Sequence, residues 1–287
     1  LSDCGSRSGT FFLSLLIAPF CLGILAQFLF DPAQNRRFWR TALTALGLTM
    51  FMLAGLAMVK IEAMICVAMA TPVLIPLQML GVALARLMKT RIPFVILSLT
   101  ILPLLAISME RLVKFPERLG TITSEIIIDA PVELVWENAI NITEIQPDER
   151  VWTRSHFWLR APQPISAELR GDIRYLRWTN GIRFRELITE KVQYQRLAWV
   201  FEFNDLDSIT AFDPHISPNS QILKITDGAY RLQALNDGRT LVTLETHFSL
   251  RSPFNGYLSW WGDVFLDDFH TSVLAVVKSR AERAQQG

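Results

Sequence analysis

The chain has 287 residues, of which 51% are hydrophobic, and a formal net charge of +1. This length suggests about two domains, and a charge so close to zero does not favour a nucleic-acid-binding protein. The three cysteines, Cys4, Cys21 and Cys66, all precede residue 110. The rest of the chain is therefore not a disulfide-linked scaffold.

Four apolar segments predict an α-helical membrane region over residues 1–109. A bilayer span needs roughly 20 apolar residues, and the last of the four segments is shorter than the others. We expect the spans at about residues 10–30, 41–59, 63–85 and 92–109. The sequence begins with Leu1 rather than Met, which leaves open whether a further segment precedes the first span.

Basic residues between these spans predict the orientation. The first loop carries Arg36, Arg37 and Arg40, and the third contains Arg86 and Lys89, whereas the turn between them is neutral. Positively charged loops stay in the cytoplasm. We therefore expect a multi-pass protein of a bacterial inner membrane, with the segment after the fourth span on the periplasmic or extracytoplasmic side.

Residues 110–120 are charged and are expected to form a juxtamembrane connector, followed by a separate domain over residues 121–283. The domain opens with the β-branched run Thr123–Asp129, which is typical of a strand. Pro131 suits the first turn of a helix, and Asp129 is placed to help cap it.

Further strands are expected where hydrophobic residues alternate, at 167–170, 173–178, 182–191, 196–203, 222–235 and 240–250. Asn236-Asp237-Gly238 is a hairpin signal, and residues 204–220 form a long irregular loop of the kind that is often functional. Apolar residues recur at helical spacing from Ser252 to Arg283. This order predicts an α+β fold, in which a curved antiparallel sheet wraps a long C-terminal helix.

The segments IIIDAPVELVWE, GIRFRELITE and RLAWVFEF, together with the terminal helix, resemble the START-like superfamily. This group is also called the polyketide cyclase/dehydrase and lipid transport, or helix-grip, superfamily. With IEAMICVAMATPVLIPLQMLG, PDERVW, FDPHI and WGDVFLDDFH, the whole chain resembles uncharacterised bacterial membrane proteins that carry this domain. The resemblance implies a helix-grip fold with a hydrophobic cavity. It does not imply one reaction.

A cavity between the sheet and the helix would hold a lipid or another hydrophobic small molecule. The residues expected to line it are Phe184, Glu186, Trp199, Phe201, His215, His247, Trp261 and Phe265. No histidine has metal-ligand spacing, so we expect no metal and no cofactor. The tryptophans can equally form the core or contact the bilayer surface.

Three groups of residues are candidates for catalysis. Glu186 shares a strand face with Phe184 and would act as a general acid or base if it were desolvated. It can instead form a salt bridge with Arg174 or Arg177. Two Asp–His sets, Asp213 with His215 and Asp267 with His270, suit proton transfer or a structural hydrogen bond.

Three functions follow from these patterns. We rank a membrane-anchored module that binds an apolar molecule first, because an apolar-cavity fold adjoins membrane spans. A structural or sensory membrane protein with a filled pocket comes second. An enzyme of the cyclase, dehydratase or hydrolase kind, using Glu186 or an Asp–His pair, comes third.

Overall fold

The computed structural model describes residues 12–58, 64–88, 95, 97, 99, 101–105, 108, 115–203, 218–220 and 222–286. The chain divides into two compact units, Leu1–Phe115 and Pro116–Gly287.

The first unit is helical in all its described elements, which are α1 (Phe12–Phe30), α2 (Phe38–Met58) and α3 (Met64–Leu87). Two of these helices, over Phe38–Gly55 and Val67–Leu87, are long and apolar enough to cross a membrane. A shorter apolar stretch covers Ile17–Phe30. Residues 101–105 are also helical, but half of the expected fourth span, 92–109, lies outside the described residues.

Helices α1 and α3 pack closely through two glycines. A Cβ atom on Gly23 would lie 2.1 Å from the carbonyl oxygen of Gln78, and one on Gly81 would lie 2.1 Å from that of Phe20. Neither position can carry a side chain unless the helices separate. Small residues at such contacts let backbones approach, which is the usual way membrane helices associate.

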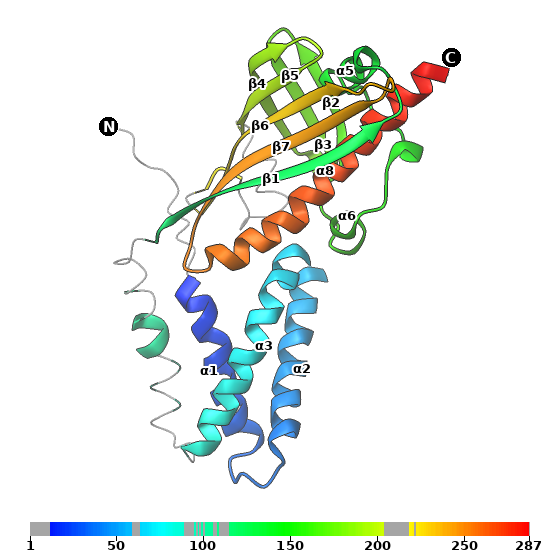
Figure 1. The fold of residues 1–287 in the computed structure, drawn as a ribbon. Coiled ribbons are helices and arrows are strands. Elements are labelled where there is room, and N and C mark those ends of the chain that lie inside the picture. The colour runs from blue at the N-terminus through cyan, green and yellow to red at the C-terminus, as the bar shows by residue number, and fades with distance from the viewer. Residues whose placement is uncertain are drawn as a thin grey trace. The chain divides into compact units, whose positions relative to one another are not determined.

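The second unit is built on one seven-stranded antiparallel sheet in the order β1-β7-β6-β5-β4-β3-β2. The strands are β1 (Glu117–Ile128), β2 (Pro164–Arg170), β3 (Ile173–Trp178), β4 (Arg183–Val192), β5 (Arg196–Glu202), β6 (Leu223–Ala234) and β7 (Thr240–Arg251). The long helix α8 (Asn255–Gln286) lies along the concave side of the curved sheet (Figure 1). This is the expected helix-grip arrangement.

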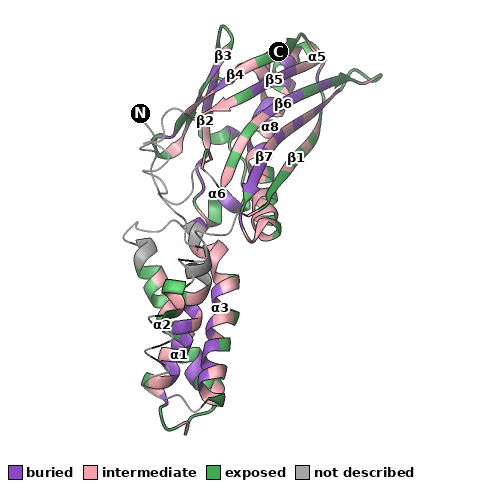
Figure 2. Ribbon diagram, turned by 90° about the vertical axis from the view of Figure 1, so that its left-hand side faces the viewer, coloured by how far each residue is buried: buried purple, intermediate pink, exposed green. Residues whose placement is uncertain are grey.

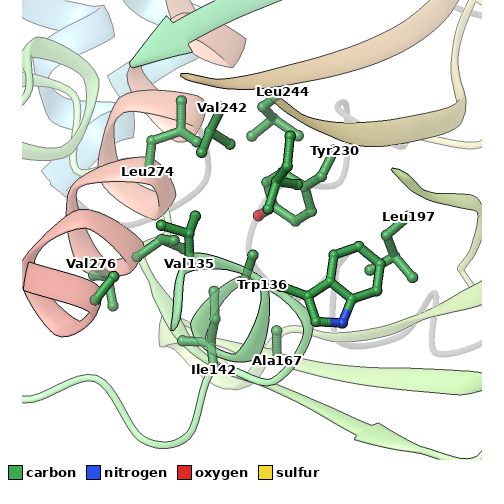
Figure 3. Close-up of a cluster of buried hydrophobic side chains, with 14 of the residues drawn as sticks. Val135, Trp136, Ile142, Ala167, Leu197, Tyr230, Val242, Leu244, Leu274 and Val276 are labelled. Atoms are coloured by element: carbon green, nitrogen blue, oxygen red, sulfur yellow. The ribbon is translucent and has the colours of Figure 1, made fainter. Parts of the chain in front are cut away.

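The main core joins the sheet to α8 and to the short helix α5 (Val132–Ile140). Val135 and Trp136 from α5 meet Leu197 and Tyr230 from the sheet, while Leu274 comes from α8 (Figure 3). Buried residues therefore run along the side of α8 that the sheet covers, whereas exposed residues mark the sheet's outer surface (Figure 2).

The first strand differs from its prediction. It begins at Glu117, within the expected connector, and pairs with β7 from Glu117↔Arg251 to Ile128↔Thr240. Its polar start was not recognisable as a strand because pairing with β7, not local propensity, holds it extended. The expected cap by Asp129 is also wrong. Pro131 is the N-cap of α5 without a side-chain bond, and the Asp129 N–H donates to Glu282.

A segment without a predicted strand or long helix connects α5 to β2. It contains a 3-10 turn, η1 (Pro147–Glu149), and the five-residue helix α6 (Arg154–Trp158). Glu149 is buried in η1, where it binds Arg280 and Arg283 of α8. These ion pairs fix the segment against α8. A second 3-10 turn, η2 (Thr179–Gly181), joins β3 to β4.

Candidate functional site

Strands β3, β4 and β5 place aromatic side chains on the concave side of the sheet. Cross-strand pairing sets Glu186 opposite Phe201 and Leu176 opposite Phe184. Side chains alternate along a strand, so Trp199, Phe201 and Phe203 share one face. The ring of Phe184 lies 5.3 Å from that of Phe203, and Phe201 stacks on Phe203 at 5.8 Å.

Helix α8 supplies a second row of rings. Trp261, Phe265 and Phe269 follow one another at i, i+4 spacing, which places them on one side of the helix. Trp261 stacks on Phe265 with 5.4 Å between centroids. Phe269 meets Trp178 of β3 edge to face at 5.0 Å, which joins the helix row to the sheet row.

We name these eight side chains the aromatic face: Trp178, Phe184, Trp199, Phe201, Phe203, Trp261, Phe265 and Phe269. Trp199 is buried, with 2% of its surface exposed, whereas the other seven are only half-buried. Gly228 makes room for Trp199, because a Cβ atom there would lie 2.9 Å from the indole. The face is therefore partly open, unlike the closed core around Val135.

Three indole groups of the aromatic face have unused hydrogen-bonding capacity. The Nε1 atoms of Trp178, Trp199 and Trp261 are buried and have no hydrogen-bond acceptor among the described residues. An indole N–H is a donor only, and a buried donor without an acceptor is destabilising. These N–H groups could be satisfied by an oxygen atom of a bound molecule.

Glu186 lies next to this face in a buried ion pair. Its Oε2 accepts a hydrogen bond from Arg174 Nε at 2.5 Å, and Arg174 Nη1 donates to the carbonyl oxygen of Ala139 at 3.1 Å. The guanidinium also lies 4.6 Å from the Trp199 ring centre. Burial raises the pKa of the Glu186 carboxyl, and the adjoining guanidinium opposes this rise.

This geometry corresponds to the salt-bridge alternative for Glu186. A carboxylate whose oxygen is bound to an arginine inside the core is not placed to exchange protons with a substrate. Tyr230 belongs to the same polar group, since Arg174 lies 5.5 Å from its ring centre. Burial raises the pKa of Tyr230 to about 12, so its phenol stays protonated at neutral pH.

His270 lies inside a chain of hydroxyl groups on another part of α8. Its Nε2 is 2.8 Å from Thr246 Oγ1, and its Nδ1 is 3.0 Å from Ser124 Oγ. The Ser124 hydroxyl donates to Asp267 Oδ1 at 3.0 Å. Asp267 and His270 are therefore linked through Ser124 rather than paired directly.

The hydrogen bonds of this chain fix the tautomer of His270. Because the Ser124 hydroxyl donates to Asp267, its oxygen accepts a hydrogen bond from His270 Nδ1–H. When the imidazole is neutral, its proton is therefore on Nδ1, and Nε2 accepts from the Thr246 hydroxyl. Burial, opposed by Asp267, lowers the pKa of His270 to about 4. A ring so poor at taking a proton does not suit a general base near neutral pH.

The remaining expected site residues divide into two groups. His247 is on the outer face of β7, where its Nδ1 lies 2.8 Å from Asp227 Oδ1, and it does not reach the aromatic face. Alternation along β7 turns its neighbour Thr246 inward and His247 outward. Asp213 and His215 lie outside the described residues.

His156 of α6 is a buried histidine that was not singled out from the sequence. Its Nδ1 lies 2.6 Å from Thr153 Oγ1 and 3.2 Å from Ser272 Oγ, and its ring stacks on Phe269 at 5.4 Å. Burial lowers the pKa of His156, and Asp268 opposes this change. Helical spacing from Phe265 was the available signal for Phe269, while no local pattern pointed to His156.

A small cavity adjoins His156. It has a volume of about 10 Å³ and is lined by Ile145, Arg150, Val151, His156, Gln163, Pro164, Ser272 and Val276. This volume holds about one water molecule. A cavity of this size is far too small for a lipid.

The sequence matches no family model and no curated protein. Among solved structures, it is similar to the Zhui aromatase/cyclase from Streptomyces sp. R1128, with 14% identity, 58% of this chain and 96% of that chain covered, and a TM-score of 0.35. It is also similar to protein NE0264 from Nitrosomonas europaea, with 16% identity, 58% and 97% covered, and a TM-score of 0.35. A protein of unknown function from Staphylococcus aureus matches with 11% identity, 60% and 98% covered, and a TM-score of 0.37. Similarities of this size do not place the chain in a family or indicate its activity.

Proposed function

We propose that the second unit binds an apolar small molecule or lipid at the aromatic face. The observation that carries the proposal is the convergence of seven half-buried rings from β3, β4, β5 and α8 beside buried indole N–H groups. Ligand sites are typically apolar surfaces with a few placed polar groups. The rings would cover the apolar body of the ligand, and an indole N–H would bind one of its oxygen atoms.

The polar groups beside the face support binding rather than chemistry. Glu186 and Arg174 neutralise each other in the core, and burial keeps His270 neutral near pH 7 by lowering its pKa to about 4. Among the described residues, neither Glu186 nor His270 is therefore left available for proton transfer to a ligand on the aromatic face.

The same proposal includes anchoring of the chain in a membrane through its first unit. Two apolar helices of sufficient length and the glycine contact between α1 and α3 support it. The basic groups gather at one end, since Arg86 Nη2 donates to the Arg36 carbonyl oxygen at 2.8 Å. With a fourth span over residues 92–109, that end would be cytoplasmic and the ligand-binding unit extracytoplasmic.

A structural or sensory protein with a filled pocket is the second candidate. It is favoured by the solid packing between α5, α8 and the sheet, beside which the cavity next to His156 holds about one water molecule. In that case the aromatic face would simply complete the core together with neighbouring segments. The two candidates differ in whether a specific molecule is bound.

Mass spectrometry of an organic extract of the purified full-length chain separates them. Bulk lipid accompanies any membrane protein, so a Phe201→Ala variant is extracted in parallel, with Tyr175→Ala on the outer face as the matched control. The proposal predicts a species near one per chain in the wild type and in Tyr175→Ala that is depleted in Phe201→Ala. Identical extracts from all three proteins would support the filled-pocket protein.

A further inference from the structure

A group of large, exposed aromatic side chains lies on α6 and just before it. Trp152, Phe157 and Trp158 keep 61%, 67% and 69% of their surface exposed. Phe157 contacts both tryptophans, with ring centroids 5.9 Å and 6.4 Å apart. Contiguous exposed rings are unfavourable in water and mark an interaction surface.

Arginines are interleaved with these rings. Arg150, Arg154 and Arg160 are exposed, and residues 150–160 contain no acidic residue. None of the three forms an ion pair with another described residue. We name Arg150, Trp152, Arg154, Phe157, Trp158 and Arg160 the Arg–Trp surface.

Two carboxylates close to α6, those of Asp268 and Glu149, are already occupied. The Asp268 carboxylate of α8 accepts a hydrogen bond from the Ser155 backbone N–H of α6 at 2.6 Å. Glu149 is buried and bound by Arg280 and Arg283, which lower its pKa to about 2. The positive charge of the Arg–Trp surface is therefore not cancelled by these groups.

The segment that carries this surface is held rigidly. Thr153 caps α6 and contacts His156, while Ser272 of α8 lies against the same imidazole. Arg160 follows the helix with a φ of 54°, a left-handed conformation that ordinary residues seldom adopt. A fixed backbone lowers the ordering cost when the exposed side chains bind a partner.

We propose that the Arg–Trp surface docks on a lipid surface that contains anionic headgroups. Tryptophan is enriched at the boundary between headgroups and acyl chains, and arginines are attracted to anionic lipids. Charge complementarity favours this partner, and the apolar helices of the same chain would keep a bilayer within reach. The inference rests on the proposed membrane anchoring but not on a ligand at the aromatic face, so docking and ligand binding can fail separately.

The test places a fluorescent label beside the surface. Cys4, Cys21 and Cys66 are changed to serine, and Val151→Cys or, as the control, Asn236→Cys at the β6–β7 turn is labelled. The full chain is reconstituted into nanodiscs of phosphatidylcholine, with or without phosphatidylglycerol, that contain spin-labelled lipid. Co-elution with the discs verifies insertion independently of docking.

Docking predicts that the spin-labelled lipid quenches the label at 151 in the anionic discs and not the label at 236. Each change among Arg150→Gln, Arg154→Gln and Arg160→Gln is expected to lower the docked-to-free ratio roughly fivefold. High salt should act in the same direction, because it screens the attraction.

Three outcomes would overturn the proposal. Equal quenching at 151 and 236 in anionic discs would show no docking. Equal quenching at 151 in both lipid mixtures would remove the role of the arginines. A change at 151 on adding single-stranded RNA, without a change on adding anionic lipid, would identify a nucleic-acid surface instead.

Discussion

Arg174 and Glu186 stand directly opposite each other on β3 and β4 and form an ion pair inside the core, with 2.5 Å between Nε and Oε2. The same guanidinium binds the Ala139 carbonyl oxygen at the end of α5 and covers the ring of Trp199. One residue pair thus connects the sheet, a helix and the aromatic face.

Removing one charge of this pair should cost much of the stability of the second unit. Glu186→Gln keeps the side-chain volume but leaves the Arg174 charge buried without a counter-charge, and we expect a loss of about 3–5 kcal/mol. Thermal unfolding of the purified chain, followed by tryptophan fluorescence, measures the change.

The control for that variant is Glu202→Gln. Glu202 binds Arg185 at 2.6 Å with about a third of each side chain exposed, and exposed pairs contribute at most about 1 kcal/mol. The double variant Arg174→Leu/Glu186→Leu should be less destabilised than Glu186→Gln, since no charge stays buried. Equal losses in the single and double variants would contradict this account of the pair.

Because His270 is buried with a lowered pKa, the second unit should lose stability in mild acid. The folded-state pKa of His270, about 4, lies below its unfolded value of 6.5, so the neutral form is favoured by folding. The stabilisation is complete above pH 6.5 and is lost as the pH falls through 4, with a size of about 3 kcal/mol. Unfolding midpoints measured across this range follow the loss.

His270→Gln should flatten that pH dependence, because glutamine can still donate and accept hydrogen bonds but does not titrate. His156 also has a lowered pKa from burial, so part of the slope will remain. His247→Gln, on the outer face, serves as the control. An unchanged slope in His270→Gln would mean that another group causes the acid sensitivity.

The absence of a side chain at Gly228 of β6 leaves space for the Trp199 indole of the aromatic face. A Cβ added at Gly228 would lie 2.9 Å from Trp199 and 2.9 Å from the Glu245 carbonyl oxygen. Gly228→Ala should therefore displace the indole and cost roughly 1–3 kcal/mol. Gly256→Ala is the control, since its Cβ would meet only the end of Arg118 at 3.6 Å. A loss of the same size in Gly256→Ala would argue against the steric cause.

The ion pairs of Glu149 should hold the α6 segment against α8. The Glu149 carboxylate accepts from Arg280 at 2.7 Å and also binds Arg283, and hydrogen bonds of charged groups contribute about 1.5–3 kcal/mol each. Glu149→Gln should speed amide exchange in residues 150–160 more than in β7. Uniform exchange rates across the unit would contradict a local attachment.

Local patterns predicted the elements better than their assembly. Alternation marked β5, Asn236-Asp237-Gly238 marked the β6–β7 turn, and the apolar repeat marked α8. The start of β1 was missed because Glu117–Gly120 is extended through pairing with β7, a contact between residues more than 100 positions apart. No local signal carries that information.

In the candidate site, too, local patterns identified residues but not their long-range partners. Alternation and helical spacing identified Phe184, Phe201 and Phe265 as residues of interest, and their role in binding stays a prediction. The partners of Glu186 were narrowed to two arginines but not decided, because the register between β3 and β4 selects Arg174. Ser124, 146 positions from His270, could not be foreseen as its partner.

The indole N–H resonances of Trp178 and Trp261 test the central claim most directly. The delipidated full-length chain, labelled with nitrogen-15 in its tryptophans and assigned by Trp→Phe variants, is titrated with the species recovered from its own organic extract. The account predicts shifts for Trp178 and Trp261 that saturate near one equivalent, with the exposed Trp39 unaffected. Unchanged Trp178 and Trp261 signals, or equal drifts of every signal, would contradict ligand binding at the aromatic face.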